Sequence, residues 1–270
     1  MDSKYLYRLG AFLKHRLTSW NTGGEGIHSP YLFYIVRMLM YDRNPYYSWE
    51  RIESRRTAML HAPKLIQTQD FGTGTSSSKL VCDIAKRELE KRRNAEFLFR
   101  LVSFLGHEKG QPLNIVELGT SLGITTAYLA MADSRNKVYT FEGSKETLEV
   151  AESNWRHLEI SNIVPLLGNI DDTLYNYARE RTTGSSSIDF AFLDANHTEE
   201  ATLRYFDILA QQAGDKSIFV FDDIHYSKGM ARAWERIKQD ARVTTTMDCF
   251  DFGIVFFDPH YLRRNYTLRL

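Results

Sequence analysis

One stretch of the chain constrains its fold more than any other. Over residues 113–126 an apolar run, an acid, a glycine-bounded loop and a helix start follow one another. The apolar run suits a buried strand, and Glu117 lies near its end. Gly119 and Gly123 bound the turn, where glycine permits positive φ and lets a ligand approach the backbone. From Thr125 the chain continues as a helix whose first N–H groups face the loop, which predicts a nucleotide-type binding turn.

The spacing of these glycines narrows the kind of site. The loop has the pattern G-x-x-x-G, whereas dinucleotide enzymes carry G-x-G-x-x-G and P-loop proteins carry G-K-[ST]. The loop therefore weighs against a nicotinamide-dependent (NAD) oxidoreductase, which stays open as an alternative.

From residue 113 onward, segments with strand character alternate with segments of helical periodicity. Strands are predicted at 113–118, 137–141, 162–167, 188–193 and 217–221, and helices at 145–158, 170–181, 198–213 and 228–242. Residues 243–249 and 252–257 predict an antiparallel hairpin around Asp251. This alternation predicts an α/β fold with a doubly wound, Rossmann-like sheet that is mostly parallel.

The first 110 residues have a different pattern. Helices are predicted at 4–18, 31–41, 48–60, 77–91 and 95–105, with Ser29 and Ser48 as helix caps. Residues 70–76 resemble a second glycine loop, but no convincing buried strand precedes them, so we interpret them as an ordered loop that opens the next helix. That this loop covers the mouth of a ligand site stays open. We divide the chain into a helical extension, residues 1–110, for a substrate lid or oligomer contacts, and a ligand-binding domain, residues 111–270.

The helix predicted at residues 4–18 is amphipathic. Its apolar side chains form one stripe, and basic side chains decorate the other side. Such a helix can lie in a membrane interface, but we favour packing of the stripe on the domain or on a second subunit.

The carboxyl ends of the predicted strands carry polar residues, and ligands of doubly wound sheets bind at those ends. Glu142 ends the second strand and is followed by Gly143. An acid at this distance from a glycine loop can accept both hydroxyls of a ribose. After the third strand, Asn169 and Ile170 are candidates to flank an adenine ring.

Three acids and two histidines follow the fourth and fifth strands. They are Asp194, His197, Asp222, Asp223 and His225. Carboxylates that converge repel one another unless a cation shares them, and a few carboxylates with water suit Mg²⁺. The structural alternative is that individual acids cap a loop or the next helix.

Composition excludes some partners. Lys plus Arg and Asp plus Glu both number 34, so the formal net charge is zero, whereas nucleic-acid-binding domains usually have a basic excess. Nucleic acid is therefore not expected as the partner, and a homodimer is compatible with the weak charge repulsion. Cys82 and Cys249 make neither a disulfide framework nor a C-x-x-C site. With no apolar run of membrane-spanning length and no leader, we expect a cytoplasmic protein without a membrane span.

Residues 113–257 together resemble the class I S-adenosylmethionine-dependent methyltransferases, and within them the catechol and caffeoyl-coenzyme A type O-methyltransferases. The resemblance rests on residues 117–123, on Glu142, on residues 192–194 and on residues 222–223. It implies a metal site at Asp194, Asp222 and Asp223, with Asp194 also close to the cofactor. The resemblance, the helix start and the strand ends together give the residues predicted to hold S-adenosylmethionine: Glu117, Gly119, Thr120, Ser121, Gly123, Thr125, Glu142, Gly143, Asn169, Ile170 and Asp194.

Two positions depart from the pattern of that family. Asp222-Asp223 stands where Asp-Asn is common, and His197 stands where a lysine is common. The resemblance predicts methyl transfer to an oxygen of a small molecule, with His197 or His225 as general base and a divalent metal as a possible assistant. A non-catalytic cofactor-binding or scaffold protein on the same fold is the alternative from another functional class.

Overall fold

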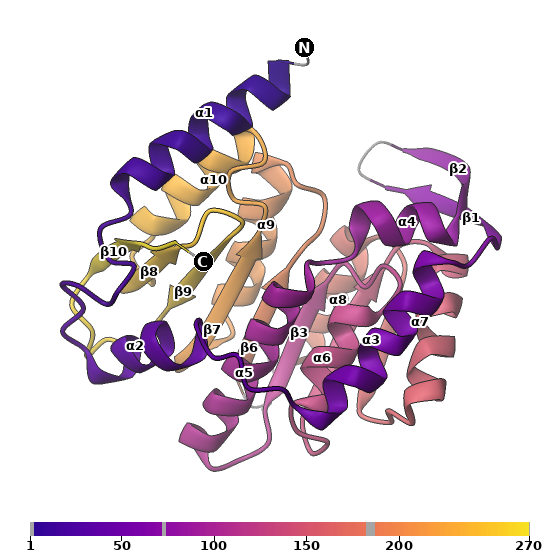
Figure 1. Cartoon of the computed structure of the whole chain (residues 1–270), viewed down its shortest axis with the longest axis horizontal. Helices are drawn as coiled ribbons and strands as arrows, with labels where there is room; N and C mark the ends of the chain where they lie inside the picture. Colours follow the sequence, from indigo (N-terminus) through magenta and orange to yellow (C-terminus); the bar gives the residue numbers. More distant parts are fainter. Residues whose placement is uncertain (1–2, 72–73, 182–186, 270) are drawn as a thin grey trace. The chain divides into compact units, whose positions relative to one another are not determined.

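The computed structural model describes residues 3–71, 74–181 and 187–269, and the chain divides into two units (Figure 1). One unit comprises residues 1–42 and 182–270, and the other comprises residues 43–181. We call them the split unit and the central unit. Their limits differ from the division predicted at residue 110, so the role of the first 110 residues as a lid or in oligomer contacts stays a prediction.

Three parallel strands form the sheet of the central unit. In it β4 (Lys137–Glu142) pairs with β3 (Asn114–Leu118) on one side and with β5 (Ile163–Leu167) on the other. The helices that follow these strands are α6 (Ile124–Met131), α7 (Lys145–Leu158) and α8 (Ile170–Arg181). Because the strands are parallel, their carboxyl ends share one edge, and the glycine loop lies there between β3 and α6.

Helices that precede the sheet in sequence complete this unit. They are α3 (Tyr47–Leu60), α4 (Val81–Glu88) and α5 (Arg92–Lys109). Aromatic side chains join α3 and α5 to α6 and α7, and Trp49, Phe99, Tyr128 and Trp155 belong to one buried cluster. The rings of Trp49 and Phe99 meet edge to face at 5.6 Å between centroids. Such pairs stabilise the fold beyond the burial of their area alone.

The helix predicted at 77–91 is wrong in its first four residues, and both ends of the loop predicted at 70–76 belong to strands. Instead, β1 (Leu65–Asp70) and β2 (Thr75–Leu80) form an antiparallel hairpin, and α4 begins only at Val81 (Figure 1). β2 consists mainly of exposed Ser and Thr, and among the β1 side chains whose burial is described only Ile66 is buried, so the pair lacks the alternating apolar pattern of a half-buried strand. Ladder hydrogen bonds and the burial of Ile66 decide the conformation.

In the split unit the strand order is β10-β8-β9-β7-β6. β6 (Ile188–Leu193) and β7 (Ala213–Asp222) are parallel and are connected by α9 (Glu199–Ala210). α10 (Lys228–Gln239) leads to β8 (Thr245–Asp248) and β9 (Phe252–Phe256), which form the predicted antiparallel hairpin. β9 also pairs antiparallel with β7, and β10 (Arg264–Thr267), which the sequence did not predict, pairs parallel with β8. The predicted fold class, α/β with a mostly parallel sheet and antiparallel strands near the C-terminus, is confirmed.

Three helices precede these strands in the split unit: α1 (Ser3–Thr18), α2 (Pro30–Tyr34) and the π-helix η1 (Ile35–Leu39). Ser29 caps α2 as predicted, because its side chain accepts a hydrogen bond from the backbone N–H of Leu32. The predicted cap Ser48 is wrong, since α3 starts one residue earlier with Tyr46 at the cap position. Among the described residues, no helix is both long enough and apolar enough to cross a membrane.

Gly253 on β9 provides a test of packing in the split unit. A Cβ at this position would lie 2.5 Å from Cη2 of the buried Trp234 ring, so Gly253→Ala forces the indole to move. We expect a loss of about 1–3 kcal/mol in the free energy of unfolding, measured by urea denaturation. Gly10→Ala in α1 is the matched control, because a Cβ there meets nothing within 4 Å. It is expected to raise stability by about 0.5–1 kcal/mol. Equal effects of the two substitutions would contradict this packing.

Candidate active site

The glycine loop turns through three residues with positive φ. They are Gly119 at 97°, Ser121 at 46° and Gly123 at 74°. The backbone N–H groups of Gly119 and Thr120 both donate to the carbonyl of Phe141 at 3.1 Å, which joins the loop to the end of β4. At Gly123 a Cβ would come within 2.6 Å of Nε1 of Trp155, so positive φ and close packing both require glycine there.

Glu117 lies beneath this loop and is fully buried. Its Oε2 accepts hydrogen bonds from the hydroxyls of Thr126 at 2.5 Å and Thr140 at 2.6 Å. The other oxygen, Oε1, is buried without a hydrogen-bond partner. Burial raises the pKa of Glu117 from 4.5 to about 7, an effect that the two threonine hydroxyls oppose and the Glu142 carboxylate adds to. Glu117 therefore supports the loop from inside, with Thr140 also 2.6 Å from the hydroxyl of Thr120.

Glu142 connects the end of β4 to the same loop. Its Oε2 accepts from the backbone N–H of Ser121 at 2.9 Å, and its Oε1 accepts from the N–H of Ser144 at 2.8 Å. Burial raises the pKa of Glu142, the hydrogen bonds from Ser144 and Ser121 lower it, and the nearby carboxylate of Glu88 raises it further. Each carboxylate oxygen has a second lone pair. The carboxylate can therefore still accept the two hydroxyls of a ribose.

Phe71, at the tip of the β1–β2 hairpin, lies against the residue after Glu142. A Cβ at Gly143 would come within 2.6 Å of Cδ2 of the Phe71 ring, so any other residue at this position would displace the ring. Two further contacts join the hairpin to α7: the N–H of Gln67 donates to Glu146, and the hydroxyl of Ser144 donates to the carbonyl of Gln67. Sequence reasoning missed Phe71 as a site residue, although it lies in the segment that resembles a second glycine loop.

The turn after β5 completes the group of predicted residues in the central unit. The N–H of Gly168 donates to the carbonyl of Glu142 at 2.9 Å, so the two strand ends are adjacent. Asn169 starts α8, where its side chain accepts from the N–H of Asp171 at 3.2 Å, and Ile170 is half-buried beside it. The central unit thus brings together the predicted cofactor residues of the loop, Glu142, Gly143 and this turn, and Thr125 is buried at the start of α6.

The remaining predicted residues lie at the carboxyl ends of β6 and β7 in the split unit. One carboxylate oxygen of Asp194 and one of Asp222 lie within 4.8 Å of each other, close enough to share a cation. Nε2 of His197 lies 3.4 Å from Oδ1 of Asp194. His197 has a φ of 35° and Asn196 a φ of 63°, so the chain turns in an uncommon conformation that points the imidazole back toward Asp194.

Asp223, in contrast, takes part in another interaction. Its Oδ1 lies 3.3 Å from the guanidinium of Arg8 on α1, which also lies 3.8 Å from Asp251. The φ of Asp223 is 52°, and its N–H donates to the carbonyl of Asp251 at 2.7 Å. The sequence offered no signal for Arg8, because its partner is more than 200 residues away along the chain.

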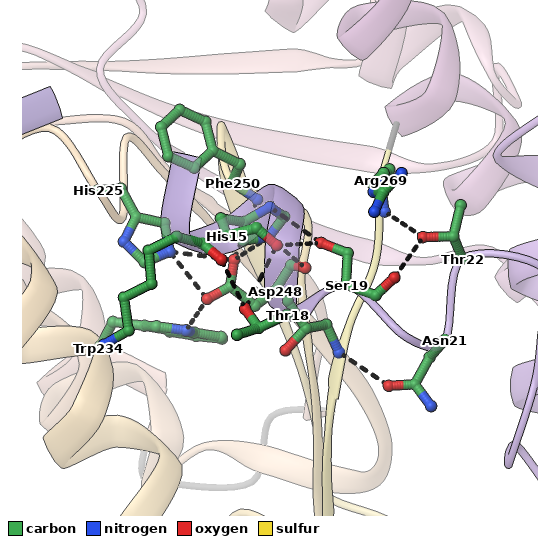
Figure 2. A network of polar contacts seen from close by, with 12 residues as sticks. His15, Thr18, Ser19, Asn21, Thr22, His225, Trp234, Asp248, Phe250 and Arg269 are labelled. Carbon is green, nitrogen blue, oxygen red and sulfur yellow. Dashed lines mark hydrogen bonds and ion pairs between the residues drawn. The ribbon is translucent and has the colours of Figure 1, made fainter. Parts of the chain in front are cut away.

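His225 belongs to a buried network around Asp248 at the end of β8 (Figure 2). Its Nε2 lies 2.9 Å from Oδ2 of Asp248, and Nε2 of His15 lies 3.0 Å from Oδ1. Trp234 donates to the same carboxylate through Nε1 at 3.1 Å. Burial alone would raise the pKa of Asp248, but the hydrogen bonds and charges of His15 and His225 hold it well below its usual range. Asp248 was missed as a candidate, although it is one more acid at the end of a strand.

Because the pKa of Glu117 is raised in the folded protein, the stability that Glu117 contributes should depend on pH. The folded protein binds the proton of Glu117 more tightly than the unfolded chain, so this contribution is fully present below about pH 4.5 and is lost as pH rises through about 7. Glu117→Gln removes the ionisation. The difference in free energy of unfolding, variant minus unsubstituted protein, should therefore increase by about 3 kcal/mol as the pH is raised from about 4.5 to about 8.

Urea denaturation at several pH values measures this difference. Glu149→Gln on the exposed side of α7 is the control and should show no such pH dependence. A difference for Glu117→Gln that does not change with pH would contradict a raised pKa.

Comparison with known proteins places this geometry in context. Residues 116–224 match a family model described as a methyltransferase domain. The structure is similar to an O-methyltransferase from Bacillus cereus in complex with SAH (S-adenosylhomocysteine), with 18% identity over 79% of this chain and 92% of that chain and a TM-score of 0.56. It is also similar to the O-methyltransferase TomG from Streptomyces achromogenes, involved in tomaymycin synthesis and bound to SAM (15% identity, 79% and 91% covered, TM-score 0.57).

A third similar structure is the SAH-bound methyltransferase PaMTH1 from Podospora anserina (14% identity, 79% and 88% covered, TM-score 0.55). Among curated protein sequences, none is significantly similar to this chain. At such low identities the structural similarity shows the fold, and the domain match agrees with it. The resemblance inferred from the sequence is thereby confirmed in its fold: residues 116–224 match a methyltransferase domain, and the structure has the fold of methyltransferases bound to SAM or SAH.

Proposed function

We propose that this protein transfers the methyl group of S-adenosylmethionine to an oxygen atom of a small molecule. The observation that carries the proposal is the position of Glu142, whose carboxylate is hydrogen-bonded to the glycine loop through Ser121. A carboxylate held in this way has free lone pairs for both hydroxyls of an unphosphorylated ribose. The O-methyltransferases with similar folds support the same assignment.

The residues of the central unit fit the proposed cofactor. Thr120, Ser121 and the N-terminus of α6 are candidates to hold its methionine end, and Gly168, Asn169 and Ile170 are candidates to flank its adenine. The buried Oε1 of Glu117 has no hydrogen-bond partner among the described residues. We assign Glu117 to support of the loop, together with Thr126 and Thr140.

S-adenosylmethionine supplies a methyl group that its sulfonium already activates. The protein has to orient the acceptor oxygen in line with that methyl group and remove its proton, and orientation alone can contribute roughly 7–11 kcal/mol. We assign proton removal to His197, because Asp194 lies 3.4 Å from its Nε2 and can stabilise the imidazolium that forms. His197 is partly exposed, so an acceptor can reach it.

His225 is the alternative base. If its Nε2–H donates to Asp248, its Nδ1 carries the lone pair that a base needs, as in other carboxylate–histidine pairs. Its ring is more buried than that of His197 and stacks on Phe250 at 5.2 Å between centroids. We therefore rank it second.

We further propose that a divalent metal such as Mg²⁺ assists the reaction. Asp194 and Asp222 would hold it, because two carboxylate oxygens within 4.8 Å of each other repel unless a cation shares them. When bound, it would lower the pKa of a coordinated acceptor hydroxyl. We give Asp223 a secondary part, because Arg8 already compensates its charge. A cytoplasmic location, a homodimer and the absence of a nucleic-acid partner stay predictions from the sequence.

The assignment of Glu142 can be tested without knowing the acceptor. Glu142→Gln keeps the shape of the side chain but removes its charge, so the affinity for SAH should fall about tenfold to a hundredfold in isothermal titration calorimetry. Glu149→Gln, which removes a charge from the exposed side of α7, should leave the affinity unchanged. Equal affinities of the two variants would refute the contact with ribose.

The role of His197 needs an acceptor, which a screen of hydroxylated small molecules with methyl-labelled S-adenosylmethionine can supply. His197→Ala should lower kcat by about a hundredfold or more and leave SAH affinity near that of the unsubstituted protein. A larger loss of kcat in His225→Ala than in His197→Ala would transfer the role to His225. SAH binding without turnover on any acceptor would favour the alternative of a non-catalytic scaffold.

Chelation separates the variants of the mechanism that use a metal from those that do not. Prolonged treatment with EDTA, followed by gel filtration, should lower kcat at least tenfold, and added Mg²⁺ should restore it. Asp222→Asn should reproduce the loss and resist rescue at the same Mg²⁺ concentration. Full activity after chelation would rule out a catalytic metal at Asp194 and Asp222.

A further inference from the structure

The helix α1 directs its apolar stripe away from the unit to which it belongs. Leu6, Leu9, Leu13 and Leu17 follow one another at helical spacing, and they are 49%, 45%, 54% and 78% exposed. Trp20, just after the helix, is 78% exposed. The sequence predicted that this stripe packs on the domain or on a second subunit. Its leucines do not pack on the described part of the chain, whereas Phe12 of the same stripe meets the Phe250 ring at 5.1 Å between centroids, and packing on a second subunit stays a prediction. An apolar row of this length on the surface indicates a binding face.

Polar groups and the Phe12 ring, which meets Phe250 at 5.1 Å between centroids, attach α1 to the split unit, and the leucines do not. His15 is buried and bonded to Asp248, and Arg8 pairs with Asp223 (Figure 2 shows the contact of His15). At about 100° of rotation per residue, positions 8, 11 and 15 lie on the side opposite positions 6, 13 and 17. The described contacts thus fix the helix by one side and leave the opposite, apolar side uncovered.

The charge of α1 has only one sign. Its sequence contains Lys4, Arg8, Lys14, His15 and Arg16 and no acidic residue. Lys14 and Arg16 are exposed on either side of the leucine row, and the guanidinium of Arg16 lies 5.6 Å from the centroid of the Phe12 ring. Because the net charge of the whole chain is zero, this positive charge is a local feature of the helix.

Two partners could cover such a face: a second copy of the chain or a lipid surface. Two α1 helices that pair in parallel, or that cross near their C-terminal ends, would bring Lys14 and Arg16 near their own copies, and neither helix has a carboxylate to compensate in any arrangement. Anionic phospholipid offers negative headgroups for the basic side chains and acyl chains for the leucines, and Trp20 suits the boundary between them. We propose that α1 lies flat on membranes that contain anionic phospholipid, held by its leucine row and by Lys14 and Arg16.

Flotation of the full-length protein with vesicles tests this proposal. The protein should float with vesicles of phosphatidylcholine and phosphatidylglycerol in equal parts, and much less with phosphatidylcholine alone. Leu13→Glu should lower the partition coefficient at least tenfold. Lys14→Glu with Arg16→Glu should lower it by at least about twentyfold, and high salt should weaken binding of the unsubstituted protein.

Leu262→Glu is the matched control, because Leu262 is 71% exposed and lies outside α1. It should bind vesicles like the unsubstituted protein. If Leu13→Glu proves unfolded by circular dichroism, Leu17→Glu replaces it, since Leu17 is 78% exposed at the end of the helix. Absence of binding to the anionic vesicles would overturn the proposal. A second result would also overturn the proposal. In it, the unsubstituted protein does not bind vesicles and is a dimer by light scattering, and Leu13→Glu separates this dimer into monomers.

Discussion

The central unit depends on one buried carboxylate. Glu117 receives hydroxyl hydrogen bonds from Thr126 on α6 and Thr140 on β4, and Thr140 in turn contacts Thr120 in the glycine loop. One side chain therefore joins two neighbouring strands, the loop between β3 and α6, and the first turn of that helix. These contacts hold the loop and the start of the helix from inside the unit. Burial of Glu117 in this position raises its pKa, so the carboxyl group ionises less readily than an exposed one.

The split unit also depends on a buried carboxylate, but the pKa of this one, Asp248, is lowered, whereas that of Glu117 is raised. The carboxylate of Asp248 contacts the imidazoles of His15 on α1 and His225 in the turn after β7, and it accepts a hydrogen bond from Trp234 on α10. Histidines can carry positive charge, so they lower the pKa of Asp248 although it is largely buried, whereas the neutral threonines around Glu117 do not prevent a rise. The same network attaches α1 by its polar side, which explains why its leucines remain uncovered.

The sequence predicted the elements that bury many apolar side chains, and it failed for strands that bury few of them. The helix at 145–158, the helix at 170–181 and the strand at 188–193 agree with α7, α8 and β6. The β1–β2 hairpin and β10 carry mostly exposed polar residues, so no periodicity reveals them. The loop and strand-end residues of the candidate site follow from spacing, since parallel strands align their ends. Phe71, Arg8 and Asp248 come from segments distant in sequence, and only the folded structure shows their contacts.

The central claim is that the carboxyl ends of β3, β4 and β5 hold S-adenosylmethionine, and hydrogen–deuterium exchange tests it most directly. Saturating SAH should slow amide exchange in residues 117–126, 142–144 and 168–171 and leave β8 and β9, which contain no proposed cofactor residue, unchanged. NAD at the same concentration should protect none of these segments. Protection of these segments by NAD and not by SAH, or protection by SAH only elsewhere in the chain, would contradict the account.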